Sequence, residues 1–127
     1  MTRPFEELAH AAWEARENAH VLGSTAVGCA VASETGAIFV GCNVQHKYRS
    51  HDIHAETNAI GTMVAGGGEK LIAVFVAAER DRFTPCGACM DWIFEFGGAD
   101  CIVMWQSTKN GSVGKLTAAA LMPYYPE

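Results

Sequence analysis

The sequence predicts an α/β protein in which helices cover a mixed β-sheet. Three observations support this fold class: a helical apolar period opens the chain, a strand-like hairpin follows it, and helical and strand-like segments then alternate. With 127 residues, 50% of them hydrophobic, the chain can bury one sizeable core. We therefore expect a single domain over residues 1–127.

The chain begins with an expected helix and hairpin. From Pro4, apolar residues recur at helical spacing with acidic residues between them, and this helix should end near Asn18. Residues 26–32 and 37–40 are strand-like runs, and the short polar turn at 33–36 between them predicts an antiparallel hairpin.

A second helix is expected after a polar stretch from Asn43 to Asp52. It should begin at His54 or Ala55 and end near Ala65, because three consecutive glycines follow.

The second half of the chain alternates between strands and helices. Residues 71–78 are apolar on both faces, as in a buried central strand, and a helix over 86–96 and a strand over 101–105 follow. After a turn at 109–111, residues 116–122 are expected to form the last helix. The helices between successive strands are long enough for right-handed crossovers, which favours a mixed sheet.

Charge and composition exclude several classes of partner. The formal net charge is -5, and the nine lysines and arginines form no run that could follow a nucleic-acid backbone or an anionic membrane. The N-terminus is acidic and lacks the apolar stretch of a secretory signal, and no segment approaches about 18 consecutive apolar residues. Five cysteines without a secretory context indicate reduced thiols and metal binding, so we expect a cytoplasmic protein.

Two short motifs carry the chemistry: His54-Ala55-Glu56 and, about thirty residues later, Pro85-Cys86-Gly87-Ala88-Cys89. One histidine and two cysteines suit tetrahedral zinc and leave its fourth position open to water. Cys86 and Cys89 can point the same way at the start of a helix. His54 and Glu56 can converge on one site only if His54 lies at the edge of its helix.

Glu56 is the expected proton carrier. Zinc with two thiolates and a neutral imidazole is a neutral site and a weaker acid than zinc with three imidazoles. A positioned carboxylate is therefore needed to take the proton of the zinc-activated water, and Glu56 is the candidate inside the motif.

The two motifs together are the known signature of zinc-dependent nucleobase deaminases. With Gly41-Cys42-Asn43-Val44-Gln45 before them and Leu121-Met122-Pro123 after them, the chain resembles the cytidine deaminase family from about Ala26 to Tyr125. The resemblance implies a three-layer α/β/α fold with a five-stranded mixed sheet. It also implies a homo-oligomer, commonly a homotetramer, whose active sites borrow residues from neighbouring subunits.

The resemblance assigns roles to individual residues. It implies His54, Cys86 and Cys89 as zinc ligands and Glu56 as the proton shuttle, and it places the Ala55 backbone amide against the pyrimidine. The Asn-Val-x-His segment and the Pro-Tyr-Tyr tail are more similar to blasticidin S deaminases than to ordinary cytidine deaminases.

Three departures from the family pattern concern the substrate. Asn43 and Gln45 match the segment that grips the ribose hydroxyls, but Gln45 stands where the family has a carboxylate. Thr25 occupies the position of an aromatic residue that faces the pyrimidine, and Tyr124 or Tyr125 are candidate substitutes. The Arg-Gln pair that follows the second cysteine is replaced by Met90-Asp91.

The predicted function is zinc-dependent hydrolytic deamination of a small molecule: cytidine, deoxycytidine or a cytidine-like nucleoside. Blasticidin S, another modified cytosine nucleoside or a free base is an alternative substrate. A different class stays open, either a Cys-x-x-Cys redox protein or a structural zinc site. The structural site would draw its fourth ligand from Cys29, Cys42, Cys101, His46 or His51.

Overall fold

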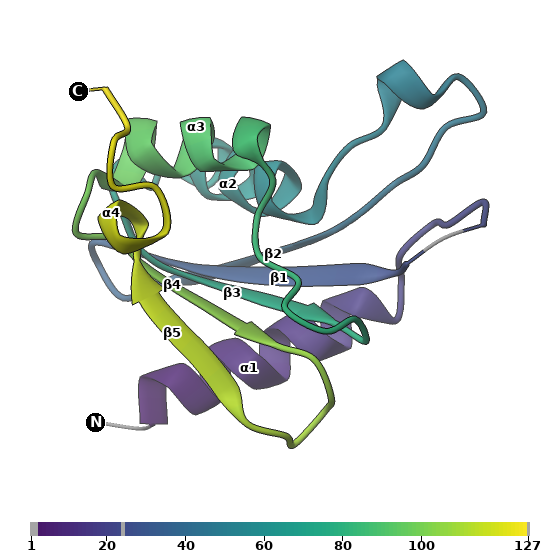
Figure 1. The fold of residues 1–127 in the computed structure, drawn as a ribbon, viewed down its shortest axis with the longest axis horizontal. Helices are drawn as coiled ribbons and strands as arrows, with labels where there is room; N and C mark the ends of the chain where they lie inside the picture. The colour runs from purple at the N-terminus through teal and green to yellow at the C-terminus, as the bar shows by residue number, and fades with distance from the viewer. Residues whose placement is uncertain (1–2, 24, 127) are drawn as a thin grey trace.

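The computed structural model describes residues 3–23 and 25–126 and has three layers (Figure 1). Helix α1 covers one face of a five-stranded mixed sheet, and helices α2 and α3 cover the other. This arrangement confirms the α/β/α fold and the five strands that the resemblance implies. The elements are α1 (Arg3–Arg16), β1 (Val27–Ser33), β2 (Ile38–Cys42), a 3-10 turn η1 (Arg49–His51), α2 (Ala55–Ala65), β3 (Leu71–Ala78), α3 (Gly87–Gly97), β4 (Ile102–Gln106), β5 (Val113–Thr117) and α4 (Ala118–Leu121).

The strand order in the sheet is β2-β1-β3-β4-β5. Strand β1 pairs antiparallel with both β2 and β3, so that Val31 lies opposite Phe39 on one side and Val74 on the other. Strands β3 and β4 are parallel, and β4 pairs antiparallel with β5. Helix α3 is the crossover between the two parallel strands, as the length of that segment predicts.

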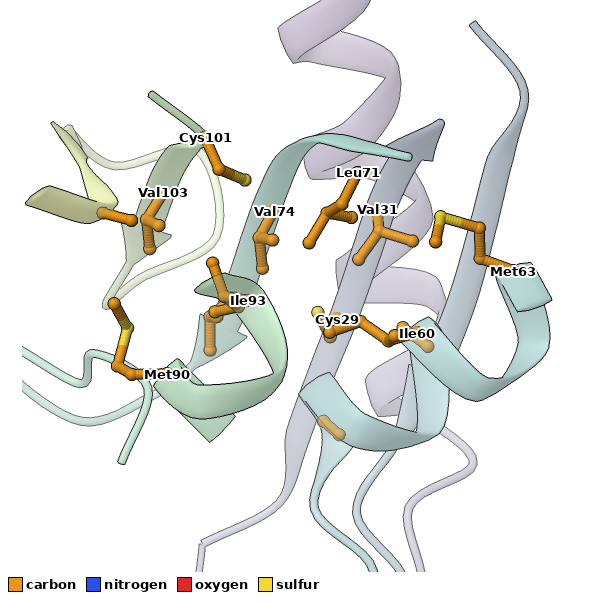
Figure 2. Packing of buried hydrophobic residues seen from close by; sticks show 14 of the residues in the cluster. Cys29, Val31, Ile60, Met63, Leu71, Val74, Met90, Ile93, Cys101 and Val103 are labelled. Carbon is orange, nitrogen blue, oxygen red and sulfur yellow. The ribbon is translucent and has the colours of Figure 1, made fainter. Parts of the chain in front are cut away.

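Two apolar cores lie on the two faces of the sheet. Figure 2 shows the larger one, where side chains of α2 and α3 such as Ile60 and Ile93 point toward Cys29, Val31 and Val74 of the strands. The smaller core packs α1 against the other face. Its fully enclosed members are Leu8, Ala12, Trp13, Ala30, Ala73, Phe75, Ala77 and Met104. Both faces of β3 are therefore covered, which is why this strand is apolar along its whole length and buried at every residue except Ile72.

The helix predicted over residues 116–122 is wrong at its first two residues, and the strand before it was not predicted. Residues 113–117 form β5, and the short helix α4 begins only at Ala118, where the Thr117 hydroxyl accepts a hydrogen bond from the Ala120 amide at 3.1 Å. The strand was missed because it is an exposed edge strand with little apolar pattern. Gly114 fits there because a Cβ atom would collide with the Trp105 ring on β4.

The other predicted elements are confirmed to within about two residues, a normal uncertainty for element ends. Helix α1 ends at Arg16 instead of Asn18, and the predicted hairpin is the β1–β2 pair. Within the described part of the chain, no helix has the length and apolar character needed to cross a membrane.

Candidate active site

The three predicted metal ligands lie at the beginnings of two neighbouring helices. His54 is the N-cap of α2, with an extended backbone (φ -82°, ψ 153°), and Cys86 is the N-cap of α3. Cys89 follows in the first turn of α3. The structure thus agrees with the requirement that His54 lie at the edge of its helix, outside the helical turn that carries Glu56.

The ligand atoms form a compact triangle. His54 Nδ1 lies 3.4 Å from Cys86 Sγ and 3.4 Å from Cys89 Sγ, and all three ligand atoms lie within 4.8 Å of one another. With the usual zinc–nitrogen and zinc–sulfur bond lengths, a tetrahedral ion separates such N and S ligands by about 3.6 Å. The donor set and its spacing therefore fit zinc without rearrangement of the backbone.

The burial of Cys89 disfavours its thiolate form unless a metal is bound. Burial, the Glu56 carboxylate and Cys86 together raise the pKa of the Cys89 thiol far above its ordinary value. The Cys89 thiolate therefore forms near neutral pH only when a bound cation replaces the thiol proton. Among the described residues, the cluster that could hold a metal contains these three side chains, so it leaves one tetrahedral position for a non-protein ligand.

Glu56 lies in the first turn of α2 with 3% of its surface exposed. Burial raises the pKa of this carboxyl group, while the neighbouring His54 and a hydrogen bond with Cys89 lower it. The burial effect is the larger, so the group holds a proton more readily than a carboxylate in water does. A buried carboxyl beside an open metal position is suited to accept and return a proton.

A cavity of about 230 Å³ opens beside the metal cluster. Of the predicted site residues, it is lined by His54, Cys86, Glu56, Ala55, Asn43 and Gln45. It is also lined by residues to which the sequence assigned no role: Val27, Arg49, Asp52, Ile53, Arg80, Phe83 and Thr84. The cavity is of the size that a small heterocycle would need, and it combines polar and apolar walls.

Asn43 and Gln45 build one wall of the cavity by holding backbone segments together. The side-chain amide of Asn43 accepts a hydrogen bond from the Val27 backbone amide at 2.9 Å and donates one to the Thr25 backbone carbonyl at 2.9 Å. The Gln45 side-chain oxygen accepts a hydrogen bond from the Leu22 amide at 2.8 Å. These hydrogen bonds hold both side chains in place.

The aromatic residue of the cavity is not one of those expected. Tyr125 stacks on Phe94 with ring centroids 3.9 Å apart, and its hydroxyl donates a hydrogen bond to the Asp91 carboxylate at 2.7 Å. Tyr124 is 95% exposed. Neither tyrosine lines the cavity of its own chain, so within one chain neither replaces the aromatic residue missing at Thr25. Phe83 lines the cavity instead.

The alternative fourth ligands lie elsewhere. Cys29 and Cys101 are buried in the core, and Cys42 is half-buried in β2. His46 and His51 belong to an exposed ring cluster, with their centroids 5.1 Å apart, and neither lines the cavity. None of these five residues belongs to the metal cluster.

A comparison with protein families decides the assignment. The model described as "Cytidine and deoxycytidylate deaminase zinc-binding region" matches residues 3–105, which is most of the chain. The chain belongs to the cytidine deaminase family. It is accordingly a zinc-dependent hydrolase of the aminohydrolase class, and zinc is its cofactor. The non-enzymatic zinc site and the redox protein are thereby set aside.

Individual relatives agree with this family. The cytidine deaminase of Sporosarcina psychrophila is 34% identical over 120 residues, covering 93% of this chain and 88% of the relative. The crystal structure of the cytidine deaminase from Burkholderia pseudomallei matches with a TM-score of 0.84 at 30% identity, covering 94% of this chain and 96% of that one. The blasticidin-S deaminase of Bacillus cereus is 28% identical over 106 residues, covering 76% of this chain and 74% of the relative.

Proposed function

We propose that this enzyme hydrolytically deaminates cytidine, deoxycytidine or a cytidine-like nucleoside, with Glu56 as the proton carrier. The observation that carries the proposal is the position of Glu56. Its buried carboxyl group lines the same cavity as His54 and Cys86, and it contacts the third ligand, Cys89. A purely structural metal site has no use for such a group.

The reaction exchanges the ring amino group for oxygen. Water adds to the carbon that carries the amino group, the C–N bond breaks, and ammonia leaves. When bound, zinc lowers the pKa of a water molecule and so supplies the nucleophile near neutral pH. Glu56 takes a proton from this water and passes it to the ring nitrogen; it then takes the proton of the added hydroxyl group and transfers it to the departing amine, as the C=O bond forms and the C–N bond breaks.

The walls of the cavity support recognition of the pyrimidine and of the group attached to it. The Ala55 backbone lies at the first turn of α2, directly before Glu56, and we propose that its amide contacts the ring. We further propose that the fixed amides of Asn43 and Gln45 contact the sugar. Because Gln45 is neutral and can donate as well as accept hydrogen bonds, a modified cytosine nucleoside is the second candidate substrate. The relative that is a blasticidin-S deaminase supports that candidate.

The role of Glu56 is tested with Glu56→Gln, using Glu69→Gln at an exposed surface position as the matched control. We expect the zinc content of both variants to equal that of the unaltered enzyme. Turnover should fall by about 10²- to 10⁴-fold in Glu56→Gln and stay unchanged in the control. A Glu56→Gln enzyme that keeps its turnover would contradict the proposed mechanism.

The substrate is tested by ammonia release from a panel of cytosine, adenine and guanine bases and nucleosides together with blasticidin S. We expect cytosine nucleosides to be deaminated and purine compounds to be left intact. Zinc-loaded enzyme that released ammonia only from purines would refute the substrate assignment.

We also propose that the enzyme is a homo-oligomer, with a tetramer favoured. Helices α2 and α3 expose apolar side chains on their outer face: Trp92 is 49% exposed, Val64 is 47% exposed, and the rings of Trp92 and Phe96 stack at 5.9 Å. A second copy of the chain would cover this surface. Light scattering at micromolar concentration should give more than one chain per particle, and a monomer there would refute this proposal.

A further inference from the structure

The charged residues of the active-site cavity are unevenly paired. Its lining contains two carboxylates, Asp52 and Glu56, and two guanidinium groups, Arg49 and Arg80. Arg49 binds Asp52 through both its Nε and its terminal nitrogen, each 2.9 Å from Asp52 Oδ2. These two residues therefore neutralise each other at the wall of the cavity.

Arg80 has no such partner among the residues that the structure describes. The ion pairs of that part of the chain are Arg16–Glu79 and Arg49–Asp52, and neither includes Arg80. Its guanidinium lies over the ring of Phe83, 5.9 Å from the ring centroid. Arg80 is exposed, so its charge is available to a molecule that enters the cavity from solvent.

The backbone holds Arg80 at this position. Strand β3 ends at Ala78, and the Arg80 amide donates a hydrogen bond to the Ala78 carbonyl at 2.8 Å, which turns the chain directly after the strand. The same connection continues through Phe83 to Cys86, where α3 begins. The backbone of Arg80 is thus held between a buried strand and the helix that carries the cysteines.

The remaining charged groups of the cavity differ in their exposure. Glu56 is buried, and a zinc ion with two thiolates and one neutral imidazole would add no net charge. Arg80 is therefore the exposed cationic group of the cavity lining that has no ion-pair partner among the described residues. A substrate that places its aminopyrimidine beside the buried Glu56 directs its ring substituent toward the exposed rim of the cavity, where Arg80 lies.

We propose that Arg80 determines specificity by binding an anionic group on the substrate, so that the preferred substrate is a cytosine nucleoside carrying a carboxylate or a phosphate on the side away from the amino group. This inference rests on the proposed function. The planar guanidinium suits both anions because it donates two parallel hydrogen bonds. Arg80 is a substrate-binding residue in this assignment and has no part in proton transfer.

The test compares a neutral and two anionic substrates on the zinc-loaded enzyme. The substrates are cytidine, cytidine 5′-monophosphate and the 5′-carboxylic acid of cytidine, and kcat/KM is measured for each at low and high salt. The variants are Arg80→Gln, which removes the charge, and Arg80→Lys, which keeps it. Arg82→Gln is the matched control, because Arg82 lies in the same turn but does not line the cavity.

The unaltered enzyme should prefer at least one anionic substrate over cytidine, and the preference should shrink as salt increases. Arg80→Gln should reduce the ratio of anionic to neutral kcat/KM by about 10- to 100-fold. Arg80→Lys should recover part of this ratio, and Arg82→Gln should leave it unchanged. The identity of the preferred anionic substrate distinguishes a carboxylate from a phosphate.

Two results would overturn the inference while leaving the proposed function intact. The first is an enzyme that deaminates cytidine at least as well as both anionic substrates. The second is an Arg80→Gln variant in which kcat/KM falls equally for all three. If the zinc-loaded enzyme deaminates no cytosine compound at all, the proposed function itself is wrong, and the inference falls with it.

Discussion

Gly41 on β2 lies against the backbone of α2, and we expect Gly41→Ala to impair catalysis without altering any residue of the cavity. A Cβ atom at this position would lie 2.8 Å from the Ala55 carbonyl oxygen and 2.6 Å from Asn58 Oδ1, and closer still to the Ala59 amide nitrogen. Nonbonded carbon contacts need roughly 3.5 Å. To bring the distance between this Cβ and the Ala55 oxygen back to that value, α2 must move away from the sheet by about 0.7 Å or more.

This displacement would move the start of α2 relative to α3. His54 and Glu56 flank Ala55, whereas Cys86 and Cys89 belong to the other helix. Overpacking of this kind costs about 1–3 kcal/mol of unfolding free energy. A misplacement approaching 1 Å costs about 10²-fold in rate. Urea unfolding measures the first effect, and turnover per bound zinc measures the second.

Gly61→Ala in the same helix is the matched control. An added Cβ at Gly61 meets no atom within 4 Å, so this substitution should raise stability by about 0.5–1 kcal/mol, as Gly to Ala does inside a helix. Turnover should stay at the level of the unaltered enzyme. Equal turnover in the Gly41→Ala and Gly61→Ala variants would refute the argument that the close approach of β2 to α2 sets the geometry of the site.

Three further predictions concern the core, a buried thiol and the metal. Gln106 accepts a hydrogen bond from the Trp13 indole at 2.6 Å and donates one to the Gly111 carbonyl at 2.7 Å, so Gln106→Ala should cost about 1–3 kcal/mol in urea unfolding. Turnover of the folded variant should not change, and a loss below 0.5 kcal/mol, about the lower limit for one such bond, would contradict this account. Burial raises the pKa of Cys101 to about 12, so this thiol stays protonated in the folded protein at pH 8 and should react only after unfolding. Mass spectrometry after iodoacetamide treatment at pH 8 should find Cys101 modified only in unfolded protein, and rapid modification of the folded enzyme would argue against its burial. Removal of zinc by a chelator should abolish turnover and lower the unfolding midpoint, with both restored by added zinc, because the ion binds the folded state. Turnover that survives complete removal of zinc would refute the assignment of the metal centre.

The metal centre could be predicted because its geometry is local. His54 and Cys86 each stand at a helix start that the surrounding sequence marks, and the spacing of Cys86 and Cys89 brings both thiols to one side. What the motifs alone do not specify is that two helix starts separated by thirty residues lie side by side. That juxtaposition came from the family resemblance, and the structure agrees with it.

The remaining walls of the cavity could not be predicted in the same way. Arg80 and Phe83 lie in a polar connection whose residues show no period, and their inclusion depends on how the chain turns after β3. The sequence suggested the substrate contact that we propose for Asn43, whereas its hydrogen bonds to Thr25 and Val27 could not be predicted because they form only once separate segments are folded together. Strand β5 was missed because an exposed edge strand needs few apolar residues.

The connection between β3 and α3 contains Arg80, the proposed determinant of substrate choice, but not Glu56. Its two ends are anchored, one by a buried strand and the other by the helix that carries the cysteines, whereas residues 79–84 between them are exposed or only half-buried. Mutations there can reshape the rim without replacing His54, Glu56, Cys86 or Cys89. A family that keeps one hydrolytic centre could therefore acquire new substrates by varying this short segment, and directed evolution of this enzyme should begin with it.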